Sequence, residues 1–478
     1  MRRTMVAILA GVSCLGLPLD ATRGGPLDVA RGGPLGAADP YASIDGPHLK
    51  SYVEELAAMS RRYRDNGHPQ FWGRIIGSEA DAENGRWLMA RLKALGLADV
   101  REQSFDLPPQ WMPQSWSVTA SGGGKIVTLG SAQPTHRGVA TPAGGIELEA
   151  VDVGLATDAD LARQDLKGKA VFFYSNDYMS RHATASNGAW KRIGEKGAAA
   201  IFITLMIPGN LHFQFYPVQS PVPTFALGQD DGLAVRELIA KAAGGPAPRV
   251  KLALDVKMVP DLKTATIWGT LPGTGDENIM VVAHRDAWFE GANDNGTGIA
   301  TLLGIAEYFA KIPAAQRRRT ITFIGSTGHH DGTAESGTWL SQHPELFAKT
   351  ALLINCEHTA ANQLVSYNGT VRKASSTSPL MWYVGGSHAL EEIVLGAYRT
   401  FGVPIYDRGE RGAAGEIGRI QNLAPSMQLI DTGLYWHSDK ETPEIIPADG
   451  LAATTRAYAK IIADINALEL KDLQRPHN

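Results

Sequence analysis

Residues 279–286 and the turn after them carry side chains that could bind a metal ion. The apolar run 279–283 ends abruptly in His284, Arg285 and Asp286, and Asp294 follows in a turn rich in Gly and Asn. Imidazole and carboxylate groups suit zinc, and the Asp286 carboxylate could accept the second ring N–H of His284 and fix its tautomer. A histidine at the end of a strand is more often structural, so this stretch by itself predicts no more than half of a site.

Three later apolar runs also end in histidine or acidic residues. The runs and the residues that follow them are 320–327 with His329, His330 and Asp331; 351–356 with Glu357 and His358; and 426–431 with Trp436 and His437. Short apolar runs of this kind are typical of buried strands. Because the carboxyl ends of parallel strands meet at one edge of an open α/β sheet, the four runs predict one shared site at that edge.

The order and spacing of these motifs resemble those of the co-catalytic zinc aminopeptidases, in particular the branch that includes glutamate carboxypeptidase and the transferrin receptor. The matching motifs are the His-x-Asp at 284–286, the turn at 291–298, the Asn-x-Glu at 355–357 and the aromatic-His pair at 436–437. The resemblance implies an α/β, three-layer fold with a mixed sheet between helices. It also implies two zinc ions: Asp294 would bridge them, His284 and Glu357 would bind one, and His437 would bind the other.

The chain departs from this family at the pair His329-His330, where the family has Glu-Glu. The first Glu is the general base that activates water, and the second is a zinc ligand. His330 could still bind zinc, but the lost negative charge predicts a weaker second site or another divalent metal there. His329 could accept the proton from a metal-bound water, with Asp331 and Glu335 as spare acids nearby. The alternative is that this loop has lost catalysis.

Substrate contacts are harder to predict. Trp436 stands where the family has a Tyr, so it could stabilise an oxyanion only through its indole N–H. Arg408 and Arg411 lie in a Gly-rich loop and could bind a substrate carboxylate, although a solvated loop is the better explanation. The nearest match to the family's Ser-Asp-aromatic pocket motif is the sequence 415–417, which does not identify pocket residues.

Composition places the chain among ordinary globular proteins. It has 478 residues, a net charge of −4 and 20% charged residues, so no basic field predicts binding to nucleic acid. Residues 1–22, with a charged start and a short apolar stretch, predict a signal peptide for export to the periplasm or the outside. That stretch is too short for a membrane span, and the context of Cys14 is a poor lipoprotein signal. Without Cys14, Cys356 is the only cysteine and no internal disulfide is expected.

The domain organisation is predicted from changes in pattern along the chain. Residues 23–43 repeat an Arg-Gly-Gly-Pro-Leu sequence and predict a flexible linker. Residues 44–114 would form the first part of a metallopeptidase-like domain and residues 261–478 the second. Helical patterns thin out between them, and residues 115–260 resemble the protease-associated domain, a β-rich insertion of the same enzyme branch. Such an insertion shields the site, helps to hold substrate or serves as a structural lid.

Two functions follow. In the first, the protein is an exported zinc-dependent hydrolase of peptide or related amide bonds, with a peptide or small amide as substrate. In the second, it is a catalytically inactive relative that serves as a binding module, as the transferrin receptor does. Four of the five family ligands persist and the fifth position holds another good zinc ligand, which favours a working metal site. The oligomeric state is left open, a homodimer included.

Overall fold

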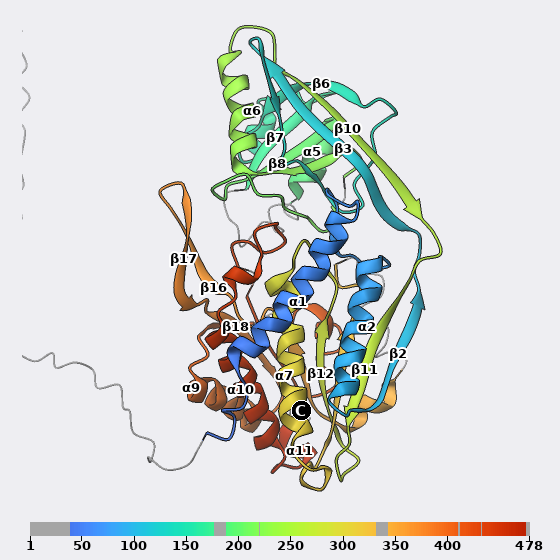
Figure 1. Cartoon of the computed structure of the whole chain (residues 1–478). Coiled ribbons are helices and arrows are strands. Elements are labelled where there is room, and N and C mark those ends of the chain that lie inside the picture. Colours follow the sequence, from blue (N-terminus) through green and yellow to red (C-terminus); the bar gives the residue numbers. More distant parts are fainter. Residues whose placement is uncertain are drawn as a thin grey trace, which may run out of the picture. The chain divides into compact units, whose positions relative to one another are not determined.

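Two eight-stranded sheets organise the part of the chain that the computed structural model describes, which is residues 39–175, 188–218, 220–330, 343–409, 412–431 and 433–474. Both sheets belong to the unit Ser43–Asn478 (Figure 1). None of the described helices is long and apolar enough to cross a membrane.

The main sheet places the predicted site at one edge. Its strand order is β19-β18-β20-β15-β12-β14-β11-β2. The bounds are β2 Ala98–Asp106, β11 Lys263–Leu271, β12 Asn278–His284, β14 Thr320–Ser326, β15 Thr350–Cys356, β18 Leu380–Gly385, β19 Ile405–Arg408 and β20 Ser426–Ile430. The neighbours β20, β15, β12 and β14 run parallel. The four strands predicted to carry the site therefore end at the same edge of the sheet.

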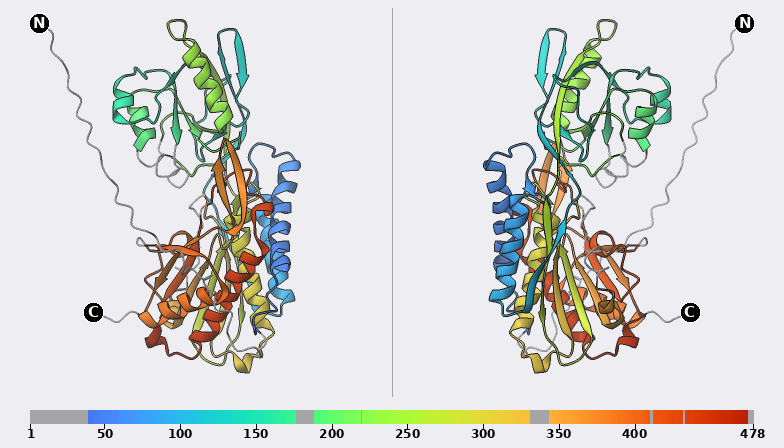
Figure 2. Two further views of the ribbon diagram at one scale, coloured as in Figure 1. Left: turned by 90° about the vertical axis from the view of Figure 1, so that its left-hand side faces the viewer. Right: turned by 90° about the vertical axis from the view of Figure 1, so that its right-hand side faces the viewer.

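Helices cover one face of this sheet. The bounds are α1 Gly46–Asp65, α2 Glu79–Ala94, α7 Gly298–Ala310, α9 His388–Phe401, α10 Ala448–Ile465 and α11 Leu470–Leu473. Figure 2 shows α1 and α2, in blue, side by side along the sheet. Helix α7 packs against β12, α1 and α10 at once. A Cβ on Gly304 would lie 2.6 Å from Leu49 Cδ2 and 2.9 Å from Thr455 Cγ2, so glycine permits this close approach.

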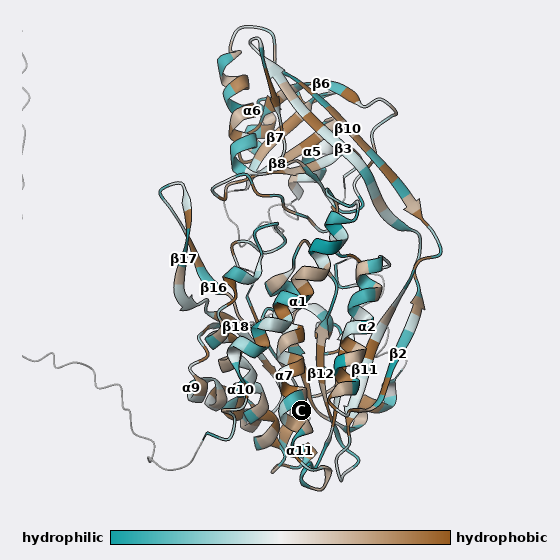
Figure 3. Ribbon diagram, viewed as in Figure 1, coloured by the Kyte–Doolittle hydropathy of each residue, from teal (hydrophilic) through white to brown (hydrophobic). Residues whose placement is uncertain are grey.

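The other face of the sheet carries its own apolar cluster. Met280 and Val282 of β12 pack there with Ile417 and Ile420, while Ile279 and Val281 alternate to the helical face. The 3₁₀ segments η5 Gly415–Ile417 and η4 Pro344–Lys349 lie on this side. Every residue of β12 and β15 is buried, as expected of strands covered on both faces, and Figure 3 shows β12 as predominantly hydrophobic. The architecture is the predicted mixed α/β fold.

Eight strands between residues 110 and 259 form the second sheet, in the order β4-β3-β10-β6-β7-β8-β9-β5. Its strands are β3 Gln110–Gly122, β4 Lys125–Thr128, β5 Gln133–Pro134, β6 Ile146–Asp152, β7 Ala170–Ser175, β8 Ala200–Leu205, β9 Thr224–Leu227 and β10 Arg249–Val259. Helices α3 Asp158–Ala162, α5 Trp190–Glu195 and α6 Gln229–Lys241 accompany them. The strands β6, β7, β8 and β9 are parallel neighbours. The predicted boundaries at 115 and 260 thus lie within β3 and just after β10, and the region between them contains helices as well as strands.

Candidate metal centre

A single buried carboxylate, that of Asp294, gathers four histidines around it. Its Oδ1 lies 3.0 Å from His284 Nε2 and 3.3 Å from His358 Nε2. Its Oδ2 lies 3.2 Å from His330 Nε2 and 2.9 Å from His437 Nε2. All five side chains are buried. Each oxygen of the carboxylate therefore faces its own pair of imidazole nitrogens, which is how one carboxylate can bridge two metal ions.

The parallel strands explain why these residues meet. His284 ends β12, His330 lies four residues beyond the end of β14, and His358 lies two residues beyond the end of β15. Asp294 follows β12 in the irregular segment η2 Ala292–Thr297, which leads into α7, and His437 lies in the loop after β20. The structure brings together His284, Asp294, His330 and His437, as the sequence predicts.

The donor atoms fit a metal ion better than they fit one another. His284 Nε2, Asp294 Oδ1 and His358 Nε2 are buried, and none of the three has a hydrogen-bond partner among the described residues. Such atoms are costly to bury unless something pairs with them. The sets His284–Asp294–His358 and Asp294–His330–His437 each offer three ligand atoms within 4.8 Å of one another. Nitrogen and carboxylate donors in sets of three are typical of zinc sites that keep a position for water.

Glu357, predicted as a ligand, lies beside this arrangement. Its Oε2 accepts hydrogen bonds from Asn355 Nδ2 at 2.7 Å and from Gln428 Nε2 at 3.1 Å, and its Oε1 is 3.8 Å from His329 Nε2. Its ligand atoms group with those of His284, His329 and Glu416. The neighbouring His358, for which no role was predicted, faces Asp294 instead. Both residues are therefore placed to contribute to the half of the centre that contains His284.

His329 lies between two residues that the sequence did not predict. Its Nδ1 is 2.9 Å from Glu416 Oε1, and its Nε2 is 2.9 Å from the hydroxyl of Tyr216. Its ring stacks on that of His284, with the ring centroids 4.2 Å apart. Burial acts to lower the pKa of His329 in the metal-free protein, but the nearby carboxylates, that of Glu416 first and then that of Glu357, together outweigh it, and the pKa rises to about 9.

Asp286 contacts His284, as predicted, and also a second histidine. His284 Nδ1 lies 3.1 Å from the backbone carbonyl of Asp286, while the carboxylate is farther away, at 3.6 Å. The Asp286 Oδ2 instead accepts a hydrogen bond from the backbone N–H of His330 at 3.0 Å and lies 3.2 Å from its Nδ1. Asp286 therefore orients the histidine that replaces the family's second Glu, and its backbone orients His284.

Two buried charged residues hold the loops of the centre. Glu441 Oε1 accepts hydrogen bonds from the backbone N–H groups of Asn293 at 2.9 Å and Asp294 at 2.6 Å, and its Oε2 accepts one from His437 N at 2.9 Å. Burial, and then the nearby Asp294 carboxylate, raise the pKa of Glu441 to about 8. Arg74 is fully buried and donates to the carbonyls of residues 285, 290 and 291 at 3.0, 2.8 and 3.1 Å.

The predicted substrate residues separate in the structure. Trp436 belongs to the centre: its indole N–H donates to Asp294 Oδ2 at 2.6 Å, and its ring centroid lies 3.9 Å from that of His437. Arg408, on β19, is not brought to the metal cluster, because its guanidinium pairs with Glu391 at 2.9 Å and lies over the Trp382 ring. Arg411 lies outside the described residues, as do Asp331 and Glu335.

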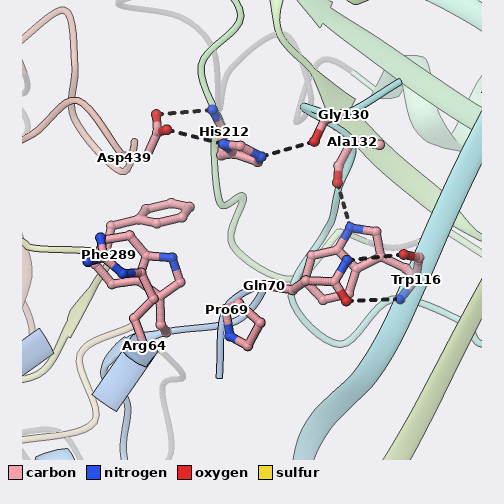
Figure 4. A pocket seen from close by; sticks show the side chains of 10 residues that line it. Arg64, Pro69, Gln70, Trp116, Gly130, Ala132, His212, Phe289 and Asp439 are labelled. Carbon is pink, nitrogen blue, oxygen red and sulfur yellow. Dashed lines mark hydrogen bonds and ion pairs between the residues drawn. The ribbon is translucent and has the colours of Figure 1, made fainter. Parts of the chain in front are cut away.

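A segment of the second sheet also reaches the centre. Between β8 and β9, Gln214 N donates to His437 O at 2.9 Å, Phe213 forms a β-bridge with Ser438, and His212 Nδ1 lies 3.1 Å from Asp439 Oδ2. A cavity of about 290 Å³ lies beside this junction. Its lining includes Arg64, Gln70, Trp72, Trp116, His212, Phe289 and Asp439. Figure 4 shows the His212–Asp439 pair together with two hydrogen bonds between Gln70 and the backbone of Trp116, one donated by each residue.

Comparison with known proteins gives a match to the part of the chain that carries the centre. Residues 266–462 match peptidase family M28, and this segment contains every histidine and carboxylate of the centre described above. This part of the chain is therefore similar to the peptidases of family M28.

Individual relatives are distant. A probable glutamate carboxypeptidase of Arthroderma benhamiae is 25% identical over 208 residues, which is 42% of this chain and 27% of the relative. A probable leucine aminopeptidase 2 of Trichophyton verrucosum is 25% identical over 263 residues, which is 53% of this chain and 47% of the relative. The alignments thus span less than half of these relatives. The structure of BSAP, a zinc aminopeptidase from Bacillus subtilis, shares the fold, with a TM-score of 0.63 and 17% identity over 90% of this chain and 98% of that one.

Proposed function

We propose that the protein is a zinc-dependent peptidase with two metal sites that share Asp294. The observation that supports this most directly is the pairing of two histidines with each oxygen of the Asp294 carboxylate. His284, Asp294 and His358 would hold one ion, with Glu357 beside them, and Asp294, His330 and His437 would hold the other. Zinc in such a centre would polarise the scissile carbonyl and lower the pKa of the attacking water.

The chain's own residues would then move the proton. His329 replaces the family's general base, and Glu416 holds its Nδ1 at 2.9 Å, so its Nε2 is directed toward the centre. A carboxylate on one imidazole nitrogen orients the ring and stabilises the charge that the ring gains when the other nitrogen accepts a proton. We propose that His329 accepts the proton of the attacking water, with Glu416 as its positioning partner. The two zinc ions beside the ring would lower its pKa below the value of the metal-free protein, which leaves Nε2 able to accept a proton. Asp286 and Glu441 keep His330 and Asp294 in place.

The proposed substrate is a peptide cleaved near one of its ends. Relatives named leucine aminopeptidase and glutamate carboxypeptidase support exopeptidase action from either end of a peptide. The names of these relatives do not agree on the end, so both directions need to be assayed.

The experiment compares turnover and zinc content in three single variants. Zinc-loaded protein is assayed with aminoacyl-coumarin amides and with N-blocked peptides, each with and without a chelator. We expect His329→Ala to lose at least about 100-fold in kcat while it keeps its zinc. His437→Ala should lose zinc first, and His388→Ala, an exposed histidine of α9, should behave as wild type. Zinc-loaded wild-type protein that cleaves none of these substrates would contradict the proposal. Unchanged kcat in His329→Ala would contradict the role of that residue alone.

A second function is favoured by one observation, the absence of both carboxylates of the family's Glu-Glu pair at His329 and His330. Without them, the fold could serve as a binding module. In that case the zinc-loaded protein would bind peptides, as measured by calorimetry, but would release no product from them.

We also propose that the protein is exported, as residues 1–22 predict; these residues lie outside the described part of the chain. Export predicts a mature chain whose mass lacks this segment. A cell-associated chain of full mass would contradict it.

A further inference from the structure

The hydroxyl of Tyr216 lies inside the metal centre although its residue belongs to the second sheet's region. It is 2.9 Å from Nε2 of His329, the nitrogen directed toward the centre. The Tyr216 ring packs against the rings of His330, with centroids 6.0 Å apart, and His437, with centroids 5.0 Å apart. The phenol therefore touches both the proposed base and one of the two proposed metal sites.

The position of this hydroxyl matters because of what Trp436 does. The indole N–H of Trp436 donates to Asp294 Oδ2 at 2.6 Å, so this donor is committed to the carboxylate between the metal sites. It is not directed at a substrate. The Tyr216 hydroxyl, by contrast, contacts His329 Nε2. When a water molecule binds to that nitrogen, the hydroxyl loses this partner and can donate to another acceptor.

The residues just before Tyr216 are anchored to the loop that carries His437. Four residues before Tyr216, His212 pairs with Asp439, and the backbone of Gln214 donates to the carbonyl of His437. The loop that contains His437, a proposed zinc ligand, therefore also binds the segment 212–214 that precedes Tyr216. A fixed donor costs little reorganisation when charge develops beside it.

We propose that Tyr216 is a further catalytic residue, whose hydroxyl donates a hydrogen bond to the substrate's carbonyl oxygen as that oxygen becomes negatively charged. This rests on the proposed peptidase function. A donor within hydrogen-bond distance of the base nitrogen lies about one water diameter from the attacking oxygen, which is where the oxyanion of an attacked carbonyl must form. The region 110–259 would then complete the active site as well as cover it.

The test is Tyr216→Phe, which removes the hydroxyl and keeps the ring and its packing. Tyr174→Phe is the matched control, because Tyr174 lies in the same region and its hydroxyl donates to Asp152 at 2.5 Å, away from the metal centre. We expect Tyr216→Phe to lower kcat about 100-fold, with KM within about threefold of wild type. Zinc content and melting temperature should equal those of Tyr174→Phe.

A binding measurement separates this proposal from the peptidase proposal. A phosphinic pseudodipeptide mimics the tetrahedral oxyanion, and calorimetry should show it binding about 100-fold more weakly to Tyr216→Phe than to wild type. If wild type turns over and Tyr216→Phe matches it in kcat and in phosphinate affinity, the role of Tyr216 is wrong and the peptidase function stands. If Tyr216→Phe loses zinc, its role is structural and the proposal is also wrong. If zinc-loaded wild type neither turns over nor binds the phosphinate, the peptidase function fails and the role of Tyr216 fails with it.

Discussion

Glu441 offers a graded test of how the centre is held together. Its side chain is 2% exposed and accepts three backbone hydrogen bonds, from Asn293, Asp294 and His437. These N–H groups belong to the two loops that carry the bridging carboxylate and a histidine ligand. Glu441→Ala would leave all three buried donors without their acceptor. Glu441→Gln would keep an oxygen for Asn293 and Asp294 but would turn an amide N–H₂ toward His437 N.

The structure sets the size of both effects. A buried polar group left without its partner costs about 1–3 kcal/mol, so three of them would cost about 3–9 kcal/mol. Water entering the vacated space satisfies part of this, and burying Glu441 close to Asp294 is itself unfavourable, as its raised pKa shows. We therefore expect Glu441→Ala to destabilise the protein by roughly 3–5 kcal/mol and Glu441→Gln by about 1–3 kcal/mol.

The assay is thermal unfolding of metal-free and zinc-loaded protein, together with zinc affinity measured by competition with a chelator. Glu444→Ala is the control, because Glu444 is exposed and only three residues away. Zinc affinity should fall by about 10-fold to 100-fold in Glu441→Ala and less in Glu441→Gln, since supporting residues of metal sites have effects of this size. If Glu441→Ala melted and bound zinc as Glu444→Ala does, the three hydrogen bonds would not hold the centre as described.

Three further predictions concern the rest of the fold. Leu303→Ala in α7, at a fully buried position, should lower the free energy of unfolding by about 2–5 kcal/mol. Leu423→Ala, at a position that is 56% exposed, should leave it unchanged. Calorimetry measures both variants, and equal stabilities would refute the packing described for α7. The hydrogen bond to Asp439 raises the pKa of His212 above its ordinary value of 6.5. The pair therefore stabilises the folded state fully when the pH is below 6.5, and this stabilisation is lost as the pH rises through the higher pKa of the folded state. Because the pair is partly exposed, its contribution to the free energy of unfolding should stay below about 1 kcal/mol. The difference in melting temperature between wild type and His212→Gln should be larger at pH 6 than at pH 9, and a difference independent of pH would contradict this. A Cβ on Gly415 would lie 1.9 Å from Glu357 Oε2, at a φ of +61°, so Gly415→Ala should displace Glu357 or Glu416. We expect kcat to fall at least about 10-fold and the melting temperature to fall as well, because alanine is strained at this φ; unaltered kinetics would show that the loop adapts freely.

The part of the centre that could be predicted from the sequence is the part set by strand ends. His284 and Glu357 follow apolar runs that can only be buried strands, and parallel strands bring such residues to one edge of a sheet. The predicted α/β fold and the meeting of His284, Asp294, His330 and His437 are confirmed by the structure. Their roles as ligands stay predictions.

The residues that were missed depend on contacts that no local pattern encodes. Glu357 and His358 are adjacent, and which of them faces Asp294 depends on how the chain turns after β15, where His358 has a φ of +49°. Glu416 and Tyr216 reach His329 from segments far away in the sequence, so spacing gives no sign of them. The Asp286 carboxylate lies near His284 Nδ1, at 3.6 Å, as predicted, but the sequence did not predict the nearer contact with the Asp286 carbonyl or the second contact of the carboxylate with His330.

The measurement that tests the central proposal most directly is the metal content of the mature protein. The protein is purified without a chelator and without added zinc, and inductively coupled plasma mass spectrometry counts the ions. Two sets of ligands sharing Asp294 predict close to two zinc ions per chain, with both lost in Asp294→Ala. No bound metal, together with no uptake on titration with zinc, would contradict the metal centre and the peptidase function that depends on it.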